Sequence, residues 1–452
     1  MFGTSGIRGP VGSEITGDLA LSLGRALGVE TDRVVLGRDS RESGQYLLDA
    51  LAAGLRESGT DVVDLGLAAT PTVARAVAWE DADAGVSVTA SHNPPADNGF
   101  KLWQPSGQAF ATADRERIAD RIRDGESDLV GWEACGRRES GDGRSRHLEA
   151  LAEAVDGPLV GAADGDALSA AESLSVVVDV GNGAGGLTAD ALASMGCAVE
   201  TLNAQPDGSF PGRPSEPTAE HCETLATVVG ETDAAVGIAH DGDADRTRAV
   251  AADGTFLSGD VLLAIFARAA ASEGDTVAVP VDTSLAVEDF LASAGIETTR
   301  TPVGDVHVAE ATRKPGVVFG GEPSGAWIWP AETRCPDGPL AACRVVALAA
   351  DRPLAEREAE IPTYPIRREA FPVEDKAAAM ATVETGHETL TAGRDATVSR
   401  LDGVRVDLGD AWFLVRPSGT EPVVRVTAEA RSAERTDEVF ELARNLLPAS
   451  AS

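Results

Sequence analysis

Residues 89–101, TASHNPPADNGFK, place Ser91 and Lys101 in a polar stretch that follows the apolar run AGVSV. The apolar run predicts a buried strand. A serine just beyond such a strand lies where α/β proteins place their ligands, so its hydroxyl could act as a nucleophile. His92 is a poor candidate for its base, because adjacent side chains of an extended segment point to opposite faces. A polar loop with a capping serine is the alternative interpretation.

Three aspartates, Asp241, Asp243 and Asp245, recur at every second position after the apolar run AAVGI. In an extended segment their carboxylates would face one side and repel one another. A divalent cation with oxygen ligands relieves such repulsion, and Mg²⁺ is the usual choice where phosphate is the partner. In a chain with 73 acidic residues, about two such triplets arise by chance. The position after a strand, with Arg246 beside it, favours a metal site.

A glycine-containing loop near the C-terminus carries groups that bind anions. In FLVRPSGTEPVVRV, Arg416 can grip two oxygens of an anion. Backbone N–H groups and hydroxyls can add further donors, and they come from Ser418, Gly419 and Thr420. An ordinary hairpin turn explains the same residues, because proline and glycine suit one.

A second glycine-rich loop, VVFGGEPSGAWIWP, places Glu322 and Ser324 between glycines, with Trp327 and Trp329 after them. A carboxylate and a hydroxyl in this arrangement could hydrogen-bond vicinal sugar hydroxyls. A plain glycine-rich turn explains the loop nearly as well.

The segment SVVVDVGNGAGGLTADALASMGCAVE supports a different class of function. Gly181, Gly183 and Gly186 lie after a predicted strand and before a predicted helix, and Glu200 closes the next strand. This pattern is typical of dinucleotide-binding folds and indicates an NAD-dependent dehydrogenase. A tight turn that lets a helix pack close to its strand is the alternative.

The elements that must position these loops are strands and helices in alternation. A strand, helix, strand pattern begins three times, about one hundred residues apart, and this predicts three similar α/β domains. The predicted strands are 33–37, 61–66, 84–90, 175–180, 198–202, 275–281 and 316–320, and the predicted helices are 44–59, 186–195 and 284–294. A polar, helical stretch at 111–170 contains a domain end and a connecting helix.

The C-terminal segment predicts a strand meander followed by one helix at 432–447, which is a smaller α+β domain. The fold class is therefore three similar mixed α/β domains plus this α+β domain around a central cleft, with one polar loop from each. The predicted boundaries are 1–150, 151–253, 254–365 and 366–452.

Composition restricts the partners of the chain. A formal net charge of −35 opposes binding to nucleic acid or to an anionic membrane. The start, MFGTSGIRGP, lacks the apolar region of a signal peptide, and the five scattered cysteines include no C-x-x-C pair. We therefore expect a cytoplasmic protein with reduced thiols. Only three lysines occur among 38 basic residues, and this acid-rich, lysine-poor composition suggests a halophilic source.

Several motifs in order resemble the α-D-phosphohexomutase superfamily, and most of all the archaeal phosphoglucosamine mutases. They cover essentially the whole chain, so they are more specific than any one loop. The motifs are FGTSGIRG (2–9), TASHNPPADNGFK (89–101), NAQPDGSFPGRPSEP (203–217), DGDADR (241–246), VGD (303–305), GGEPSG (320–325) and RPSGTEP (416–422).

The resemblance implies roles for these residues. Ser91 would be a phosphoserine, and its phosphate would bind one Mg²⁺ together with Asp241, Asp243 and Asp245. Arg8 and Arg246 would lie near the transferring phosphoryl group, and Lys101 would be the general acid–base. The residues that would bind the sugar and the non-reacting phosphate are Glu322, Ser324, Gly304, Asp305, Arg416, Ser418, Gly419 and Thr420.

The implied reaction interconverts a hexose 6-phosphate and a hexose 1-phosphate through a hexose 1,6-bisphosphate, which also serves as activator. The partner is then a small sugar phosphate, and the protein is a monomer or homodimer. Asp305 after Gly304 resembles the phosphoglucosamine mutases, so glucosamine phosphate is the expected substrate. Ala326 departs from bacterial relatives, which often carry histidine there. A phosphomannomutase/phosphoglucomutase, or a sugar-phosphate binder without catalysis, remains an alternative.

Overall fold

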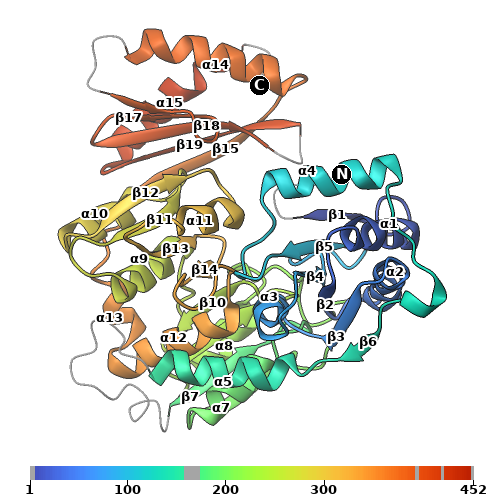
Figure 1. The fold of residues 1–452 in the computed structure, drawn as a ribbon. Helices are drawn as coiled ribbons and strands as arrows, with labels where there is room; N and C mark the ends of the chain where they lie inside the picture. The colour runs from blue at the N-terminus through green and yellow to red at the C-terminus, as the bar shows by residue number, and fades with distance from the viewer. Residues whose placement is uncertain (1–5, 157–173, 392–395, 419–421, 449–452) are drawn as a thin grey trace.

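The computed structural model describes residues 6–156, 174–391, 396–418 and 422–448, whose strands form four separate sheets. We number the four domains, I to IV, by these sheets in chain order. Figure 1 shows domain IV at the top left of the view, domain III directly below it, domain I to the right and domain II at the bottom. The predicted fold class is confirmed.

Domain I contains a six-stranded mixed sheet in the order β1-β5-β4-β2-β3-β6. Its parallel centre forms from the apolar runs RVVLGR, DVVDLGL and AGVSV, and β5 and β1 extend it in antiparallel pairing. The strands are β1 (Ile7–Pro10), β2 (Arg33–Arg38), β3 (Asp61–Leu67), β4 (Ala84–Val88), β5 (Asp97–Trp103) and β6 (Arg138–Ser140). The helices are α1 (Gly17–Gly28), α2 (Gly44–Glu57), α3 (Thr70–Trp79), α4 (Thr112–Asp124), the 3₁₀ turn η1 (Trp132–Ala134) and α5 (Gly143–Asp156).

Domain II contains a four-stranded sheet in the order β10-β9-β7-β8. Its hairpin, β9 to β10, carries the three aspartates of the predicted metal site in the connecting loop. The elements are β7 (Ser175–Asp179), α7 (Leu187–Ser194), β8 (Ala198–Leu202), α8 (Glu223–Gly230), β9 (Val236–His240) and β10 (Thr247–Ala251).

Domain III repeats this plan with the order β12-β11-β13-β14. The loop between β13 and β14 contains the glycine-flanked carboxylate and hydroxyl. The strands are β11 (Thr276–Pro280), β12 (Glu297–Thr301), β13 (Val317–Glu322) and β14 (Ala326–Ile328). The helices are α9 (Gly259–Ala270), α10 (Leu285–Ser293), α11 (Asp305–Ala311), α12 (Gly338–Asp351) and α13 (Leu354–Glu358).

Domains II and III share one hydrophobic core. Val178 and Ile238 of sheet II belong to the same buried cluster as Phe266 and Phe319 of domain III. Helix α12 contacts α5 and α7 as well as β10. The boundary predicted at 253 is therefore crossed by a continuous core, and the boundary predicted at 150 falls within α5. The loops of these two domains are held in a fixed relation by this core.

Domain IV is an antiparallel sheet in the order β15-β19-β18-β17-β16, covered by two helices. The predicted meander and final helix are present, and the structure adds β15 and α14. The strands are β15 (Ile366–Pro372), β16 (Thr397–Ser399), β17 (Val404–Asp407), β18 (Ala411–Pro417) and β19 (Val423–Ala430). The helices are α14 (Lys376–Thr391) and α15 (Ala433–Arg444).

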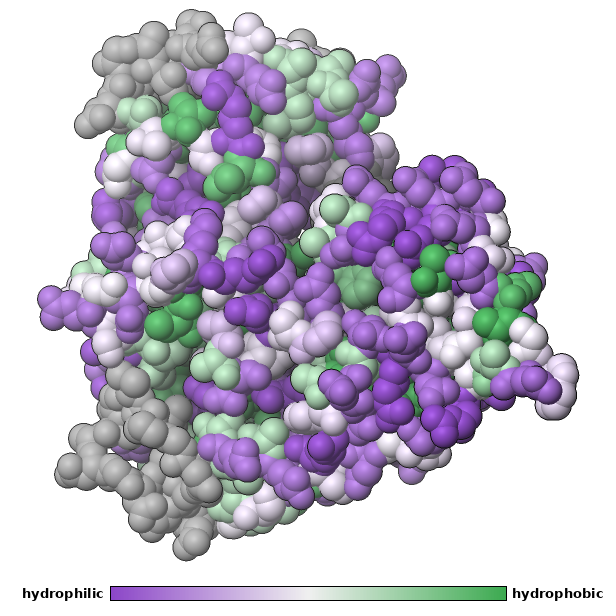
Figure 2. All heavy atoms as spheres, viewed as in Figure 1, coloured by the Kyte–Doolittle hydropathy of each residue, from purple (hydrophilic) through white to green (hydrophobic). Residues whose placement is uncertain are grey.

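The surface in the view of Figure 2 is largely hydrophilic, and its outline is indented between domains IV and I. In the part of the chain that the structure describes, no helix combines the length and the apolar character that crossing a bilayer requires.

The acidic composition predicts a strong salt dependence of stability. With 73 acidic and 38 basic side chains, repulsion between carboxylates opposes the compact state, and at 1 M salt screening shortens its range to about 3 Å. We expect the apparent midpoint of thermal unfolding to rise by about 10 °C between dilute buffer and multimolar KCl. Calorimetry at a series of KCl concentrations checks this, and equal midpoints at both extremes would contradict a halophilic adaptation.

Candidate active site

Ser91 lies three residues beyond the end of β4 and is 1% exposed. Its backbone has a φ of +54°, a left-handed conformation that costs a residue with a Cβ about 1–2 kcal/mol. Its N–H donates to Thr89 Oγ1 at 2.8 Å, and its Oγ donates to Asp241 Oδ2 at 2.7 Å. The hydroxyl of domain I therefore meets the carboxylates of domain II directly.

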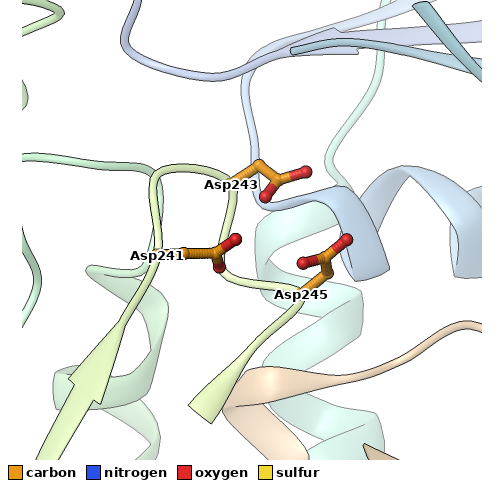
Figure 3. A group of neighbouring side chains, drawn as sticks. All are labelled: Asp241, Asp243 and Asp245. Carbon is orange, nitrogen blue, oxygen red and sulfur yellow. The ribbon is translucent and has the colours of Figure 1, made fainter. Parts of the chain in front are cut away.

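The three aspartates lie in the loop between β9 and β10, and we call residues 241–246 the aspartate loop. The prediction that this segment is extended was wrong, because it is a turn in which Ala244 has a φ of +55°. The carboxylates converge nevertheless: oxygens of Asp241, Asp243 and Asp245 all lie within 4.8 Å of one another. Figure 3 shows them grouped at the tip of the loop. The turn, and not strand alternation, brings the three anions together.

Lys101 of β5 balances part of this negative charge. Its Nζ donates to Asp243 Oδ2 at 2.8 Å and also to Asp245 Oδ2. Burial alone would lower the lysine pKa, but the two carboxylates outweigh it and raise the pKa above its usual value. Lys101 is therefore protonated in this state of the protein.

The remaining oxygens of the loop fit a hard cation. Burial and the neighbouring carboxylates Asp245 and Asp243 raise the pKa of Asp241 well above its usual value. Among the described residues, no donor reaches the buried Oδ1 atoms of Asp243 and Asp245. Buried carboxylate oxygens without donors are the ligands that Mg²⁺ prefers. The donor set therefore fits a divalent cation.

Thr70, the first residue of α3, is a site residue that the sequence did not reveal. Its Oγ1 donates to Asp243 Oδ2 at 2.7 Å, and its N–H donates to the Asp243 carbonyl at 2.8 Å. Figure 3 shows Asp243 beside the start of this helix, where the helix dipole favours a negative charge. The Thr-Pro pair signals a helix start, but nothing local indicates a partner 173 residues away.

Cations surround the space beside Ser91. Arg8 of β1 aligns with Gly99 of β5, and its Nε is buried without an acceptor among the described residues. The backbone N–H of Arg246 donates to Asp241 Oδ1 at 3.1 Å. Burial would lower the pKa of its guanidinium, but Asp241 and Asp245 lie close enough for their charges to raise it. Burial, followed by the charges of Arg246, Arg8 and Lys101, lowers the pKa of His92 to about 2. A neutral histidine in so positive an environment indicates a space suited to a phosphoryl group.

The loop from Glu322 to Ala326, which we call the glutamate loop, joins the aspartate loop directly. Arg246 forms a β-bridge with Ala326, and Thr247 N–H donates to the Gly325 carbonyl at 3.0 Å. Ser324 Oγ donates to Glu322 Oε2 at 3.0 Å. Burial, and then the charge of Asp305, raises the pKa of Glu322 to about 7.

The two tryptophans that follow the glutamate loop are buried in the hydrophobic core. Trp327 and Trp329 are 0% and 4% exposed, and both pack on Phe266 in the shared core. They fix the glutamate loop through packing and present no face to a sugar.

Domain III also contributes Gly304 and Asp305. Gly304 has a φ of +126°, a region that favours glycine, and α11 begins at Asp305. Asp305 and Lys101 line the same small cavity between domains I and III, which has a volume of about 10 Å³. This volume holds one water molecule. The structure therefore places this turn next to the Lys101 side of the site.

Of the C-terminal loop, residues 416–422, the structure describes Arg416, Pro417, Ser418 and Pro422. Arg416 donates to Asp402 Oδ2 at 3.1 Å, and the Ser418 carbonyl accepts from Lys376 Nζ at 2.7 Å. Gly419 and Thr420 lie outside the described residues. No hydrogen bond or ion pair found among the described residues links Arg416 or Ser418 to the Ser91 site.

The glycines of the predicted dinucleotide site pack against the aspartate loop. A Cβ on Gly183 would lie 2.5 Å from the Gly242 carbonyl oxygen, and Ala184 N–H donates to that oxygen at 2.9 Å. A Cβ on Gly181 would meet the Arg213 guanidinium. Gly181 and Gly183 permit close packing of protein on protein, which supports the turn interpretation over the NAD site.

The chain thus has three mixed α/β domains and a C-terminal α+β domain, with a buried serine beside a carboxylate cluster where domains I and II meet. Family models of phosphoglucomutase/phosphomannomutase match all four: domain I over residues 1–128, domain II over 147–254, domain III over 258–364 and the C-terminal domain over 370–446. The chain belongs to the phosphoglucomutase/phosphomannomutase family.

Relatives with individual names cover nearly the whole chain. A "probable phosphoglucosamine mutase" of Methanosarcina acetivorans is 44% identical, over 99% of this chain and 98% of the relative. One of Methanopyrus kandleri is 46% identical, over 97% and 95%. A phosphoglucomutase/phosphomannomutase family protein of Burkholderia thailandensis has a TM-score of 0.84 at 28% identity, over 100% of this chain and 98% of that one.

Proposed function

We propose that this protein is a phosphoglucosamine mutase, which interconverts glucosamine 6-phosphate and glucosamine 1-phosphate through a phosphoserine at Ser91. The observation that carries the proposal is the 2.7 Å hydrogen bond between Ser91 Oγ and Asp241, inside a cluster of three carboxylates. A hydroxyl in this position can exchange a phosphoryl group where a cation and arginines neutralise charge. The names of the relatives support glucosamine as the sugar.

The three aspartates, with the phosphate on Ser91, are the residues that would hold one Mg²⁺. When bound, the ion would supply positive charge beside the transferring phosphoryl group. Arg8 and Arg246 add to this charge from β1 and from the end of the aspartate loop. Phosphoryl transfer depends chiefly on such positioning and neutralisation, so these residues supply most of the catalysis.

In the forward half-reaction the bond between Ser91 Oγ and phosphorus breaks, and a bond forms from phosphorus to the free 1-hydroxyl of glucosamine 6-phosphate. The serine oxygen gains a proton from Lys101, and the proton that the sugar hydroxyl loses returns to Lys101, so no net proton is released. Lys101, which is protonated and buried beside the aspartates, is placed to donate the proton that serine gains. The product of this step is glucosamine 1,6-bisphosphate.

The second half-reaction returns the other phosphate to Ser91, so the bisphosphate must turn around in the site. Glu322 and Ser324 would bind the sugar hydroxyls in both orientations, and Gly304 and Asp305 lie at the adjoining turn. Arg416, Ser418, Gly419 and Thr420 would hold the phosphate that does not react. A hexose 1,6-bisphosphate then acts as activator, because it restores any enzyme that loses its phosphate.

A coupled mutase assay tests the function. Glucosamine 6-phosphate, mannose 6-phosphate and glucose 6-phosphate are compared in the presence of Mg²⁺ and a hexose 1,6-bisphosphate. We expect the highest kcat/KM for glucosamine 6-phosphate. A preference for either other hexose would assign a phosphomannomutase or phosphoglucomutase instead. Binding of all three without exchange between C1 and C6 would leave a sugar-phosphate binder, and would contradict the proposal.

The raised pKa of Glu322 leads us to expect that substrate binding depends on pH. Its pKa is raised to about 7, so its carboxylate form is lost as the pH falls through that value. Because a carboxylate accepts stronger hydrogen bonds from sugar hydroxyls than a neutral acid does, we expect KM to rise about 10-fold between pH 8 and pH 6. Glu322→Gln should have a high KM throughout and lack this dependence. An identical pH profile of KM in the variant would contradict the assignment, since ionisation of the substrate phosphate affects both proteins equally.

A further inference from the structure

Arg41 lies between β2 and α2 in domain I, and its side chain is completely buried. A guanidinium carries five N–H donors in a rigid fork, and all five have acceptors here. Nε donates to Asp39 Oδ2 at 3.0 Å. The other four reach backbone carbonyls of the serine loop, residues 89–97: those of Ser91 (2.9 Å), Asn93 (2.7 Å), Pro94 (2.5 Å) and Asp97 (2.9 Å).

Arg41 is also connected to the Ser91 N–H, through Asp39 and Thr89. Asp39, which balances the guanidinium charge, accepts from Thr89 Oγ1 at 2.7 Å. Thr89 Oγ1 in turn accepts the Ser91 N–H. Both the carbonyl and the N–H of Ser91 therefore belong to one network that begins at Arg41. The ring of Phe210 from domain II lies 5.0 Å from the guanidinium carbon.

The same carbonyl connects Ser91 to the aspartate loop. Ser215 Oγ donates to the Ser91 carbonyl at 2.8 Å and accepts the Gly242 N–H at 3.0 Å. The left-handed backbone of Ser91 persists only where surrounding contacts impose it. These contacts are the four-carbonyl fork of Arg41 on one side and the Ser215 bridge on the other.

We propose that Arg41 is a positioning residue for phosphoryl transfer, which holds the serine loop so that Ser91 Oγ stays aligned with the aspartate loop. This inference rests on the proposed function for its effect on turnover. Within the part of the chain that the structure describes, no hydrogen bond links Arg41 to the glutamate loop, so Arg41 acts through Ser91 and not on the sugar.

The test compares Arg41→Lys with Arg56→Lys. Lysine keeps the charge but has three donors and no planar fork, so it cannot bind all five acceptors. Arg56 is a matched control in the same domain, because its Nε donates to the Gly136 carbonyl at 2.9 Å, away from Ser91. Steady-state kinetics, and hydrogen exchange of the peptide covering 89–98, are measured on the full chain.

We expect Arg41→Lys to lower kcat about 100-fold and to leave KM within about threefold, because a misplaced nucleophile affects transfer and not sugar binding. Exchange within 89–98 should accelerate about 10-fold. Arg56→Lys should leave both kcat and the exchange rate of residues 89–98 unchanged. Ser215→Ala, which removes only the bridge, should lower kcat by a smaller factor with KM again unchanged, and this gives a second reading if Arg41→Lys folds poorly.

Two results would overturn the proposal. Unchanged exchange at 89–98 in Arg41→Lys would show that Arg41 does not hold the loop, whether or not the wild type is a mutase. Faster exchange with an unchanged kcat would show that the hold has no role in transfer. Failure of the proposed function is distinguishable, since it appears as absent turnover in the wild type, and the exchange result then decides whether Arg41 fixes the loop.

Discussion

Ser91→Ala is expected to lower mutase turnover by at least about 10⁴-fold, the loss typical of removing a covalent nucleophile. The hydroxyl is the only group of the variant that changes, and its oxygen is the atom that carries the phosphoryl group between the two ends of the sugar. Alanine also has a Cβ, so the left-handed backbone is no more strained than with serine. The fold should survive, and the coupled assay with a hexose 1,6-bisphosphate measures the loss.

Ser293→Ala is the matched control for this substitution. Its hydroxyl donates to the Phe290 carbonyl at the exposed end of α10, in domain III. Full turnover is expected in the control. Turnover within tenfold of the wild type in Ser91→Ala would remove Ser91 as the phosphoryl carrier.

Asp243→Asn is expected to abolish the effect of Mg²⁺ and to lower kcat by about 10³-fold. Asp243 contributes one of three convergent carboxylates, and an amide neither carries the charge nor offers two equivalent oxygens to the ion. The change also weakens the contacts of that carboxylate with Lys101 and Thr70. Burial would raise the pKa of Asp243, but Lys101 and Thr70 hold it below its usual value. Because the variant loses this buried ion pair, the metal-free protein should unfold at a lower temperature than the wild type.

Thermal unfolding with and without Mg²⁺ provides the readout that does not depend on turnover. The wild type should be stabilised by saturating Mg²⁺, as any ligand of the native state stabilises it, whereas Asp243→Asn should not respond. Asp253→Asn changes an exposed turn carboxylate that accepts the Thr255 N–H at 2.9 Å, and it should behave like the wild type. A normal Mg²⁺ response in Asp243→Asn would contradict the metal assignment.

The strands that the sequence predicted are those rich in apolar, β-branched residues. Runs such as RVVLGR and SVVVD can form little else than buried strands, and they form β2 and β7. In contrast, β6 (RES) and β15 (IRREAFP) were not predicted, because they are rich in charged residues. They exist because a neighbouring strand offers hydrogen bonds at the sheet edge, and pairing of that kind leaves no hydropathy pattern.

The sequence indicated which residue types form the candidate site, but not how those residues are arranged in space. The spacing of the aspartates pointed to carboxylates that do converge, but the expected extended segment was wrong, since a turn with a left-handed Ala244 brings them together. The partners Thr70 and Arg41 lie 173 and 50 residues away from the groups they bind, so no local pattern could find them. Trp327, which follows the predicted sugar loop in the sequence, is buried in the core.

The measurement that tests the account most directly is phosphate transfer at Ser91 followed by mass spectrometry. The purified protein is incubated with Mg²⁺ and a hexose 1,6-bisphosphate, and then with glucosamine 6-phosphate alone. We expect one phosphate per chain, located on the peptide that contains Ser91, and we expect glucosamine 6-phosphate to remove it as glucosamine 1,6-bisphosphate. A phosphate on another residue, or one on Ser91 that the sugar phosphate never removes, would contradict the proposed mechanism.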